Sequence, residues 1–272
     1  KYSVIVVDNG SQIPLKLPKR LNTETIQLIR SESNLGFTGG NNMGIYYATE
    51  HFNSDYILLL NNDTTVDDQF LKQLVKQAQA DDRIGIACSK IYFSKGKEYH
   101  KQSYTRQELG SVLWYAGGSV DFQHLVAFHR GVDELDRGQF DHQVESDFAT
   151  GCSMLIKREV LEKVGSLDKR FFIYLEDVDL SLRAKKHGYT ISFCPQSIVY
   201  HKNAGSTGGS GSPVQEYYQT RNRLLFAFKH GDWKTWLVAA RLIFQYLSKG
   251  NKYHKQAVFH ALTAQFGKQP IV

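Results

Sequence analysis

Short apolar runs alternate with amphipathic stretches over most of the chain. Six apolar runs have the length and composition of strands, namely residues 3–8, 25–30, 55–60, 84–93, 190–195 and 197–201. Residues 39–52 and 66–80 have the spacing of helices, and in the second of these Phe70, Leu74 and Val75 fall on one face. Because strands and helices take turns along the chain, the pattern predicts an α/β fold with a mixed, mainly parallel sheet flanked by helices.

The alternation weakens between residues 95 and 145, where we expect only short antiparallel strands. After Pro213 the pattern is helical to the end, so we divide the chain into an α/β domain, residues 1–223, and a helical C-terminal extension, residues 224–272. Among the lysines and arginines, the extension carries the apolar residues Trp233, Trp236, Leu237, Leu242, Ile243 and Phe244. Either the helix that carries these apolar residues packs on the main domain, or it lies on an anionic membrane surface.

The composition limits the class of protein and the kind of partner. Hydrophobic residues make up 42% of the 272 residues, which is enough for a sizeable core. The net charge of +6 favours anionic partners such as nucleotides or phosphorylated lipids, and no recognised motif supports nucleic-acid binding. The three cysteines form no CxxC pair, which favours buried free thiols over a zinc site. No apolar run reaches the roughly 18 residues that a membrane-spanning helix needs.

Polar side chains stand at the ends of several expected strands. Asp8, Asn61, Asp63 and His201 each come at or just after the end of an apolar run, and ligands of open α/β sheets bind at the carboxyl ends of strands. A carboxylate such as Asp63 needs solvent, a partner or a cation at the end of a buried strand, and Mg²⁺ or Mn²⁺ would suit its oxygen atoms. His201 is either a nitrogen ligand of the same cation or a polar cap on its strand.

Two glycine-rich segments suggest contact with a ligand. Residues 34–42, NLGFTGGNN, join an expected strand to an expected helix. Their glycines permit close backbone approach, and the helix start offers free N–H groups to an anion. Residues 202–213, KNAGSTGGSGSP, are flexible by composition, so they form either an inert linker or a lid that closes over a ligand.

Three acidic residues, Glu176, Asp177 and Asp179, stand at the start of an expected helix, directly after the apolar strip FFIYL. Negative charge at a helix N-terminus is favourable, so capping accounts for one or two of them. Capping does not account for the apolar strip that leads to them. An ionised carboxylate held at the rim of a pocket is what a general base requires, so we interpret this segment as a candidate catalytic element.

Six motifs in order resemble one known family. They are VIVVDNGS, NLGFTGGNN, YILLLNNDT, DFATGCSMLIKREVLEKVG, FFIYLEDVDLSLRAKKHGY and YYQTRNRLLF. Together they resemble family 2 glycosyltransferases of the GT-A fold, a Rossmann-like architecture. The likeness is closest to bacterial rhamnosyltransferase-type enzymes of cell-surface polysaccharide synthesis. It covers residues 1 to about 230, and six motifs at believable spacing make it specific.

The resemblance implies a reaction and its participants. The donor would be a sugar linked to dTDP or UDP, transferred with inversion in the presence of Mg²⁺ or Mn²⁺. The acceptor would be a hydroxyl of a lipid-linked glycan or a polysaccharide, at the cytoplasmic face of the membrane. Rhamnose is the favoured sugar, and galactose and glucose stay open.

The resemblance also implies roles by position. Asp177 would be the catalytic base, supported by Glu176, and Asp63 and His201 would hold the metal. Asn61 replaces the first acid of the family's DXD metal motif, which leaves Asp63 as the main carboxylate ligand. The donor would be bound by Asp8, Asn34, Gly36, Phe37, Asn41, Asn61 and Arg221, with Arg223 as a second arginine for the diphosphate.

The family's first strand normally precedes VIVVDNGS, and the sequence does not show it. We expect some tens of residues before Lys1, or another segment in the same place, because two neighbouring strands would otherwise have unpaired backbone groups. Two other classes of protein stay open. A non-catalytic sugar-nucleotide-binding module would lack metal-dependent transfer, and a nucleotidyltransferase would carry a triphosphate loop rich in glycine and basic residues.

Overall fold

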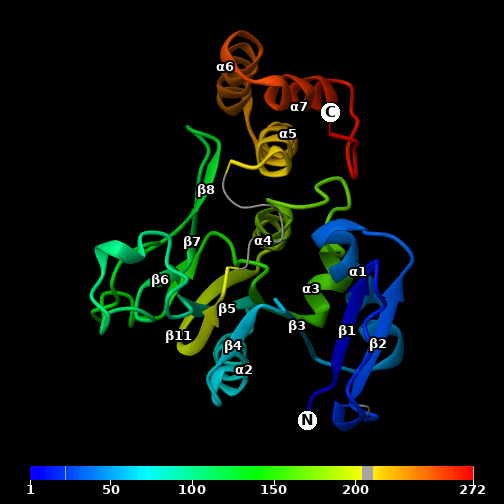
Figure 1. Ribbon diagram of the computed structural model, residues 1–272, viewed down its shortest axis with the longest axis vertical. Helices are drawn as coiled ribbons and strands as arrows, with labels where there is room; N and C mark the ends of the chain where they lie inside the picture. The colour runs from blue at the N-terminus through cyan, green and yellow to red at the C-terminus, as the bar shows by residue number, and fades with distance from the viewer. Residues whose placement is uncertain (22, 204–210, 272) are drawn as a thin grey trace.

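The computed structural model describes residues 1–21, 23–203 and 211–271, and helices surround a central sheet in it (Figure 1). Within these residues the central sheet has seven strands, in the order β3-β10-β5-β11-β4, with β6 beside β5 and β9 beside β11. Its strands are β3 (Tyr56–Leu60), β4 (Thr64–Val66), β5 (Ile84–Phe93), β6 (Leu113–Tyr115), β9 (Val144–Ser146), β10 (Ser153–Lys157) and β11 (Thr190–His201).

Four further strands form two small sheets. β1 (Val4–Asn9) pairs in parallel with β2 (Ile26–Ser31), and β7 (Gly118–Asp121) pairs antiparallel with β8 (Val126–His129). In the described part of the chain β1 pairs only with β2, and β3 only with β10, so the β1–β2 pair is not hydrogen-bonded to the central sheet. The expectation of a further strand stays a prediction.

The expected α/β architecture with a mixed sheet is confirmed. Parallel pairing is found at β1–β2 and β5–β11, and the other ladders among the described residues are antiparallel. The two apolar runs at 190–195 and 197–201 form the single strand β11, whose pairing with β5 is irregular between Cys194 and Ile198. The expected short antiparallel strands of the weak region are β6, β7 and β8.

Strand β5 is buried along almost its whole length and separates two cores. On one face of the sheet Ala87 packs with Leu74, which lies in a helix at Phe70–Ala78. On the other face Ile86 and Cys88 belong to the larger core. This split follows because successive strand residues point to opposite faces. The helices of the α/β part are α1 (Gly36–His51), α2 (Phe70–Ala78), α3 (Arg158–Val164) and α4 (Glu176–Lys186), with 3-10 turns at Lys19–Leu21 and Lys101–Ser103.

Three capped helices form the C-terminal part. Ser212, Asp232 and Asn251 each accept a backbone N–H with their side chains, and these caps begin α5 (Pro213–His230), α6 (Trp233–Lys249) and α7 (Lys252–Leu262). Helices α6 and α7 lie at the end of the molecule opposite the N-terminus (Figure 1). None of the helices in the described residues is long and apolar enough to span a membrane. The division at 223/224 stays a prediction, and the structure places it inside the continuous helix α5.

Candidate active site

Asp63 and His201 meet at one end of the central sheet although 138 residues separate them. Strand β4 pairs antiparallel with the last part of β11, which puts Thr64 opposite His201. The N–H of Lys202 donates to the carbonyl of Asp63 at 2.9 Å. Nε2 of His201 consequently lies 3.1 Å from Oδ1 of Asp63. The sequence predicted both residues at strand ends, and the ladder brings their side chains together.

The surroundings of His201 fit a metal ligand. Its side chain is buried, and the indole of Trp114 packs against it with the ring centroids 4.6 Å apart. Burial lowers the pKa of His201, although the Asp63 carboxylate opposes this, so the neutral imidazole with a free lone pair is favoured. Its Nδ1 is buried without a hydrogen-bond partner in the part of the chain that the structure describes.

Asp63 and His201 together suit a cation that takes few protein ligands. The described residues contain no group of three or more His, Cys, Asp or Glu that would enclose a metal. Mg²⁺ needs no such cage, because it commonly takes one or two carboxylates and fills its shell with phosphate oxygens and water. Mn²⁺ also accepts nitrogen and oxygen ligands. The residues present therefore fit a divalent ion that binds together with a diphosphate.

Asp177 lies in the first turn of α4, where backbone groups fix its carboxylate. Its Oδ2 accepts the N–H of Gly151 at 2.9 Å, and its Oδ1 accepts the N–H of Val178 at 2.8 Å. Burial raises the pKa of Asp177, and these N–H groups act in the opposite direction. The side chain remains partly exposed, so it is a carboxylate held in place and within reach of a ligand.

Glu176 is the more deeply buried member of the pair. Its side chain is almost wholly buried, and Oε2 has no hydrogen-bond partner among the described residues. Burial, and then the neighbouring charge of Asp177, raise the pKa of Glu176 well above its ordinary value. Two adjacent carboxyls in different surroundings commonly take different protonation states. Glu176 is therefore suited to stay protonated while Asp177 is ionised.

Replacing Glu176 by Gln is expected to raise the melting temperature at about pH 8, and the gain should shrink as the pH falls toward about 4.5. The pKa of Glu176 is raised in the folded state, so protonation stabilises the wild-type fold at low pH and this contribution is lost as the pH rises. Glutamine carries no charge at either pH. Thermal melts over this pH range measure the difference, and Glu162→Gln, at an exposed side chain of α3, is the control. An equal gain at both ends of the range would contradict a raised pKa.

Gly151 and Cys152 connect the metal pair to the acidic pair. Gly151 donates to Asp177, and the carbonyl of Cys152 accepts the N–H of Asn61 at 3.0 Å. Burial raises the pKa of the Cys152 thiol, and the carboxylates of Asp63 and Asp177 both raise it further. The segments that carry Asp63 and Asp177 thus both contact the turn before β10, at Cys152 and at Gly151. That Asp63 and Asp177 act in one active site stays a prediction.

The segment that carries Asn34, Gly36 and Phe37 lies against the same site. A Cβ on Gly36 would sit 2.4 Å from the carbonyl oxygen of Phe172, and Gly36 has a φ of 73°, so only glycine fits here. A Cβ on Gly151 would sit 2.8 Å from the ring of Phe37. Oδ1 of Asn34 accepts the N–H of Gly36 at 2.8 Å. The glycine-rich turn therefore contacts both the loop before α4, at Phe172, and the turn before β10, at Gly151.

Two other predicted donor residues already have internal partners. Asp8 accepts the N–H groups of Ser11 and Leu15 at 3.0 Å and forms an ion pair with Arg30. These hydrogen bonds, the one from Leu15 first, hold the pKa of Asp8 far below its usual range. The side chain of Asn41 donates to the carbonyl of Phe37 at 2.8 Å, inside α1. Their contacts with a donor stay predictions.

The loop before α4 has an unusual backbone. Phe172, Tyr174 and Leu175 all have left-handed φ angles, between 66° and 71°, a conformation that is strained for bulky residues and tends to occur at functional sites. The side-chain amide of Asn222 on α5 donates to this loop, with Nδ2 within 2.7–2.9 Å of the carbonyls of Phe171, Ile173 and Tyr174. Asn222 thus holds the loop that positions the two acids. Sequence reasoning missed its role, although Asn222 stands in the motif YYQTRNRLLF.

Arg221 faces the same loop and not a solvent-filled site. It is fully buried, and its guanidinium donates to the carbonyls of Arg170 and Phe171 at 2.9 Å and of Gly267 at 2.6 Å. Arg223 likewise donates to the carbonyls of His124 and Leu125. Both guanidiniums therefore use their N–H groups on backbone acceptors. The structure does not bring them to the metal pair, and their contact with a diphosphate stays a prediction.

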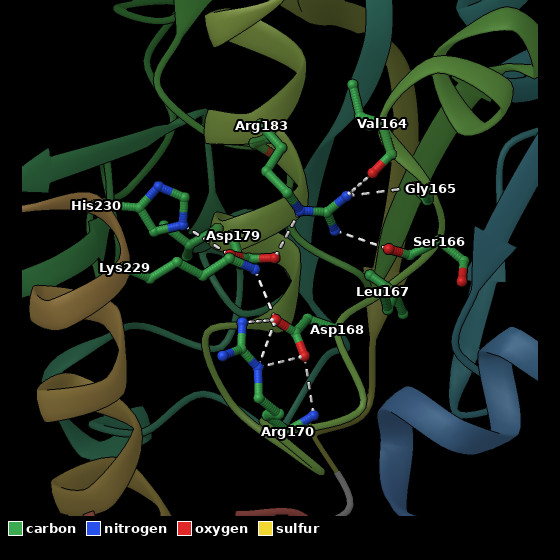
Figure 2. Close-up of polar contacts among 12 residues, drawn as sticks. Val164, Gly165, Ser166, Leu167, Asp168, Arg170, Asp179, Arg183, Lys229 and His230 are labelled. Atoms are coloured by element: carbon green, nitrogen blue, oxygen red, sulfur yellow. Dashed lines mark hydrogen bonds and ion pairs between the residues drawn. The ribbon is translucent and has the colours of Figure 1, made fainter. Parts of the chain in front are cut away.

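Asp179 anchors α4 to the neighbouring elements through a buried ionic cluster (Figure 2). Its carboxylate is 0% exposed and lies 2.9 Å from Nε of Arg183, 2.7 Å from Nζ of Lys229 and 2.6 Å from Nε2 of His230. Lys229 also pairs with Asp168 at 2.6 Å. The cluster joins α4 to α5 and to the loop before α4. Of the three acids in the motif, Asp179 is therefore structural.

Of the segment at 202–213, expected to be a linker or a lid, residues 204–210 lie outside the described residues, so the lid stays a prediction.

Known proteins are similar to this chain in sequence or in fold. It is 26% identical over 221 residues to the low-salt glycan biosynthesis hexosyltransferase Agl10 of Haloferax volcanii, covering 81% of this chain and 66% of that protein. It is 23% identical to the dTDP-rhamnosyl transferase RfbF of Shigella flexneri, covering 84% and 71%. It is 26% identical to the galactofuranosyltransferase GlfT2 of Mycolicibacterium smegmatis, covering 75% and 32%. The chain thus spans about two thirds of the first relative and one third of the last.

The fold and the family are both established by likeness. The crystal structure of GalNAc-T7 with UDP, GalNAc and Mn²⁺ superposes with a TM-score of 0.52 at 16% identity, covering 99% of this chain and 52% of that chain. This likeness concerns the fold alone, and it confirms the expected GT-A architecture. The profile described as "Glycosyltransferase like family 2" matches residues 6–226, which include every candidate site residue. The chain therefore belongs to glycosyltransferase-like family 2.

Proposed function

We propose that the chain is an inverting glycosyltransferase of bacterial cell-surface glycan synthesis. It moves a sugar from a dTDP- or UDP-linked donor to a hydroxyl of a lipid-linked glycan or a polysaccharide, at the cytoplasmic face of the membrane. The observation that supports this proposal is the turn before β10, where Gly151 donates to Asp177 and Cys152 accepts the N–H of Asn61, two residues before Asp63. In this proposal Asp177 is a fixed base, and Asp63 provides a place for a cation-held diphosphate.

The roles of the residues follow from this arrangement. Asp177 accepts the proton of the acceptor hydroxyl, and the oxygen attacks the anomeric carbon on the face opposite the nucleotide. The bond between that carbon and the diphosphate oxygen breaks as the new bond forms. Asp63 and His201 would hold a divalent cation, which when bound would supply neutralising charge for the leaving diphosphate. The buried neighbour Glu176 stays protonated and keeps a second negative charge away from the base.

The identity of the sugar is proposed from the relatives. RfbF is a dTDP-rhamnosyl transferase, and its similarity covers most of both chains, so we propose rhamnose first. GlfT2 is a galactofuranosyltransferase, which keeps galactose open, and glucose remains a third candidate. A thermal-shift screen of nucleotide sugars, each with Mn²⁺ or Mg²⁺, distinguishes the three.

Asp63→Asn is expected to abolish the thermal shift that a nucleotide sugar gives with Mn²⁺. It should also lower transfer by at least about 100-fold, because a metal supplies several kcal/mol of charge stabilisation to the transition state. The measurement is transfer of a labelled sugar, with Mn²⁺ titrated, for wild type and variant. Asp82→Asn, at an exposed turn, is the matched control. A variant with unchanged Mn²⁺ dependence would refute the assignment of Asp63.

The alternative is a sugar-nucleotide-binding module without catalysis. It is distinguished by the fate of a labelled donor, since a binding module neither transfers nor hydrolyses the sugar. A donor that binds with Mn²⁺ but stays intact with every acceptor tested would favour this alternative over the transferase.

A further inference from the structure

Helix α6 is apolar on two sides, and packing explains only one of them. On the inner side Thr235 and Ala239 are buried, and Leu242, Ile243 and Tyr246 pack against the main core. On the outer side are large side chains that are 49–76% exposed, namely Trp233, Trp236, Leu237, Phe244 and Leu247. Their spacing puts them along one stripe of the helix. We call these five residues the α6 outer face.

Exposed apolar area of this kind commonly marks an interaction site. Scattered exposed side chains need no explanation, but here five large ones fall on a single helix of 17 residues. Two of them are tryptophans, which favour the interface between a bilayer and water. The stripe therefore has both the continuity and the composition of a contact surface.

From Trp233 onward the charged side chains have one sign, although the exposed N-cap of α6, Asp232, is an acid directly before them. The whole chain contains 33 Lys and Arg and 27 Asp and Glu. Residues 233–272 hold no acid and six of the basic residues, namely Lys234, Arg241, Lys249, Lys252, Lys255 and Lys268. The rest of the chain is therefore balanced, and the full +6 net charge belongs to the last forty residues. Lys234 and Arg241 are exposed, and the helical repeat of 3.6 residues puts both of them along one edge of the stripe.

We infer that the α6 outer face docks on the surface of an anionic lipid bilayer. The apolar stripe enters the headgroup region while Lys234 and Arg241 contact anionic headgroups, which is the pattern of an interfacial amphipathic helix. A second copy of the chain is a poorer occupant. A symmetric dimer through this face would bring two copies of a helix with a net positive charge together. This docking surface goes beyond the proposed reaction and does not depend on it.

The position of α6 relates the bilayer to the active site. Helix α6 packs on α5 and shares its core, and α5 holds α4 through the contacts of Lys229 and His230 with Asp179 (Figure 2). The docked helix and the helix that carries Asp177 thus belong to one packed unit. Docking would therefore hold the helix that carries Asp177 in a fixed orientation relative to the bilayer.

The test is co-sedimentation with vesicles in the absence of donor and metal. One set of vesicles is phosphatidylcholine alone, and the other is equal parts phosphatidylcholine and phosphatidylglycerol. Wild-type protein is expected to bind the mixed vesicles at low salt, to release at high salt and to bind phosphatidylcholine weakly. The emission of Trp233 and Trp236 should shift to shorter wavelength on binding. Absence of donor makes this result independent of whether the transferase proposal holds.

Two double variants separate the contributions. Lys234→Gln with Arg241→Gln is expected to weaken binding roughly 30-fold, since each basic residue near an anionic surface contributes about 1 kcal/mol. Trp236→Ser with Phe244→Ser should weaken it at least as much, because both side chains leave water on docking. The matched controls are Lys95→Gln with Lys97→Gln, and Tyr2→Ser with Ile13→Ser, all at exposed positions. These controls should bind like wild type.

Two outcomes would overturn the inference. One is that the α6 variants bind the mixed vesicles as tightly as the controls do. The other is a concentration-dependent dimer, seen by light scattering after size-exclusion chromatography, that Trp236→Ser with Phe244→Ser dissolves. Because the substituted side chains are exposed, the variants should melt at the wild-type temperature, and this is checked first.

Discussion

Asp177→Asn is expected to lower the rate of sugar transfer by about 10²–10⁴-fold, the usual contribution of a general base. Asparagine keeps the size of the side chain and accepts the N–H of Gly151, but it cannot take the proton of the acceptor. Donor affinity should change little, because the metal pair and the glycine-rich turn are untouched. The measurements are kcat with a labelled donor and the donor Kd by calorimetry.

The pH dependence gives an independent check on Asp177. A base works only when it is ionised, so the rate should fall as the pH drops through the pKa of Asp177. Burial raises that pKa, so the acid limb should lie above the ordinary aspartate value of about 4. The control is Asp82→Asn, which should keep the wild-type rate and profile. An Asp177→Asn enzyme with wild-type turnover would remove the base assignment.

Asp179→Asn is expected to lower the free energy of unfolding by about 3 kcal/mol, the low end of the cost of breaking a buried ion pair. The fully buried carboxylate contacts Arg183, Lys229 and His230, and the neutral amide would leave the cationic side chains short of a counter-charge. In the variant Lys229 keeps its contact with Asp168. The side chains of Arg183 and Lys229 are also partly exposed, which limits the loss of stability. Urea unfolding near neutral pH measures the difference.

The pH dependence of unfolding has a definite sign here. Burial alone would raise the pKa of Asp179, but the hydrogen bond from His230 and the charges of Arg183 and Lys229 lower it below its ordinary value. Its stabilising contribution is therefore present above the unfolded pKa and is lost as the pH falls through the folded pKa. Asp81→Asn, which breaks an exposed pair with Arg83, is the control and should cost under about 1 kcal/mol. Equal losses in the two variants would show that the Asp179 cluster adds nothing beyond a surface pair.

Most elements and several site residues could be predicted from local pattern. Strand β5 is a run of ten apolar-rich residues and is found where the pattern puts it. Helix α2 (Phe70–Ala78) is shorter than the helix expected at residues 66–80, and Val66 belongs to β4 instead. Polar residues at the ends of β3 and β11 predicted Asp63 and His201 as site candidates. The merger of two apolar runs into β11 was not predicted, because its continuity comes from pairing with β5 across a register shift.

Arg221 and Asn222 of the motif YYQTRNRLLF show what local sequence patterns cannot predict. Local sequence gives Arg221 and Asn222 as charged and polar residues on a helix, and it does not say what they face. The structure buries Arg221 against the backbone carbonyls of residues 170–171, and Asn222 against those of residues 171–174. Both contacts span about fifty residues of sequence, and periodicity within one helix carries no information about them.

The sequence by itself determined the alternation of strands and helices, the strand-end polar residues and the acidic start of α4, because each depends on neighbours within a few residues. It also determined that the net positive charge lies in the last forty residues. Only the tertiary structure decided that Asp63 and His201 meet, that Gly151 holds Asp177, and that Asp179 is structural. Those relations depend on chain segments that approach across 26 to 138 residues, and packing and backbone ladders set that approach.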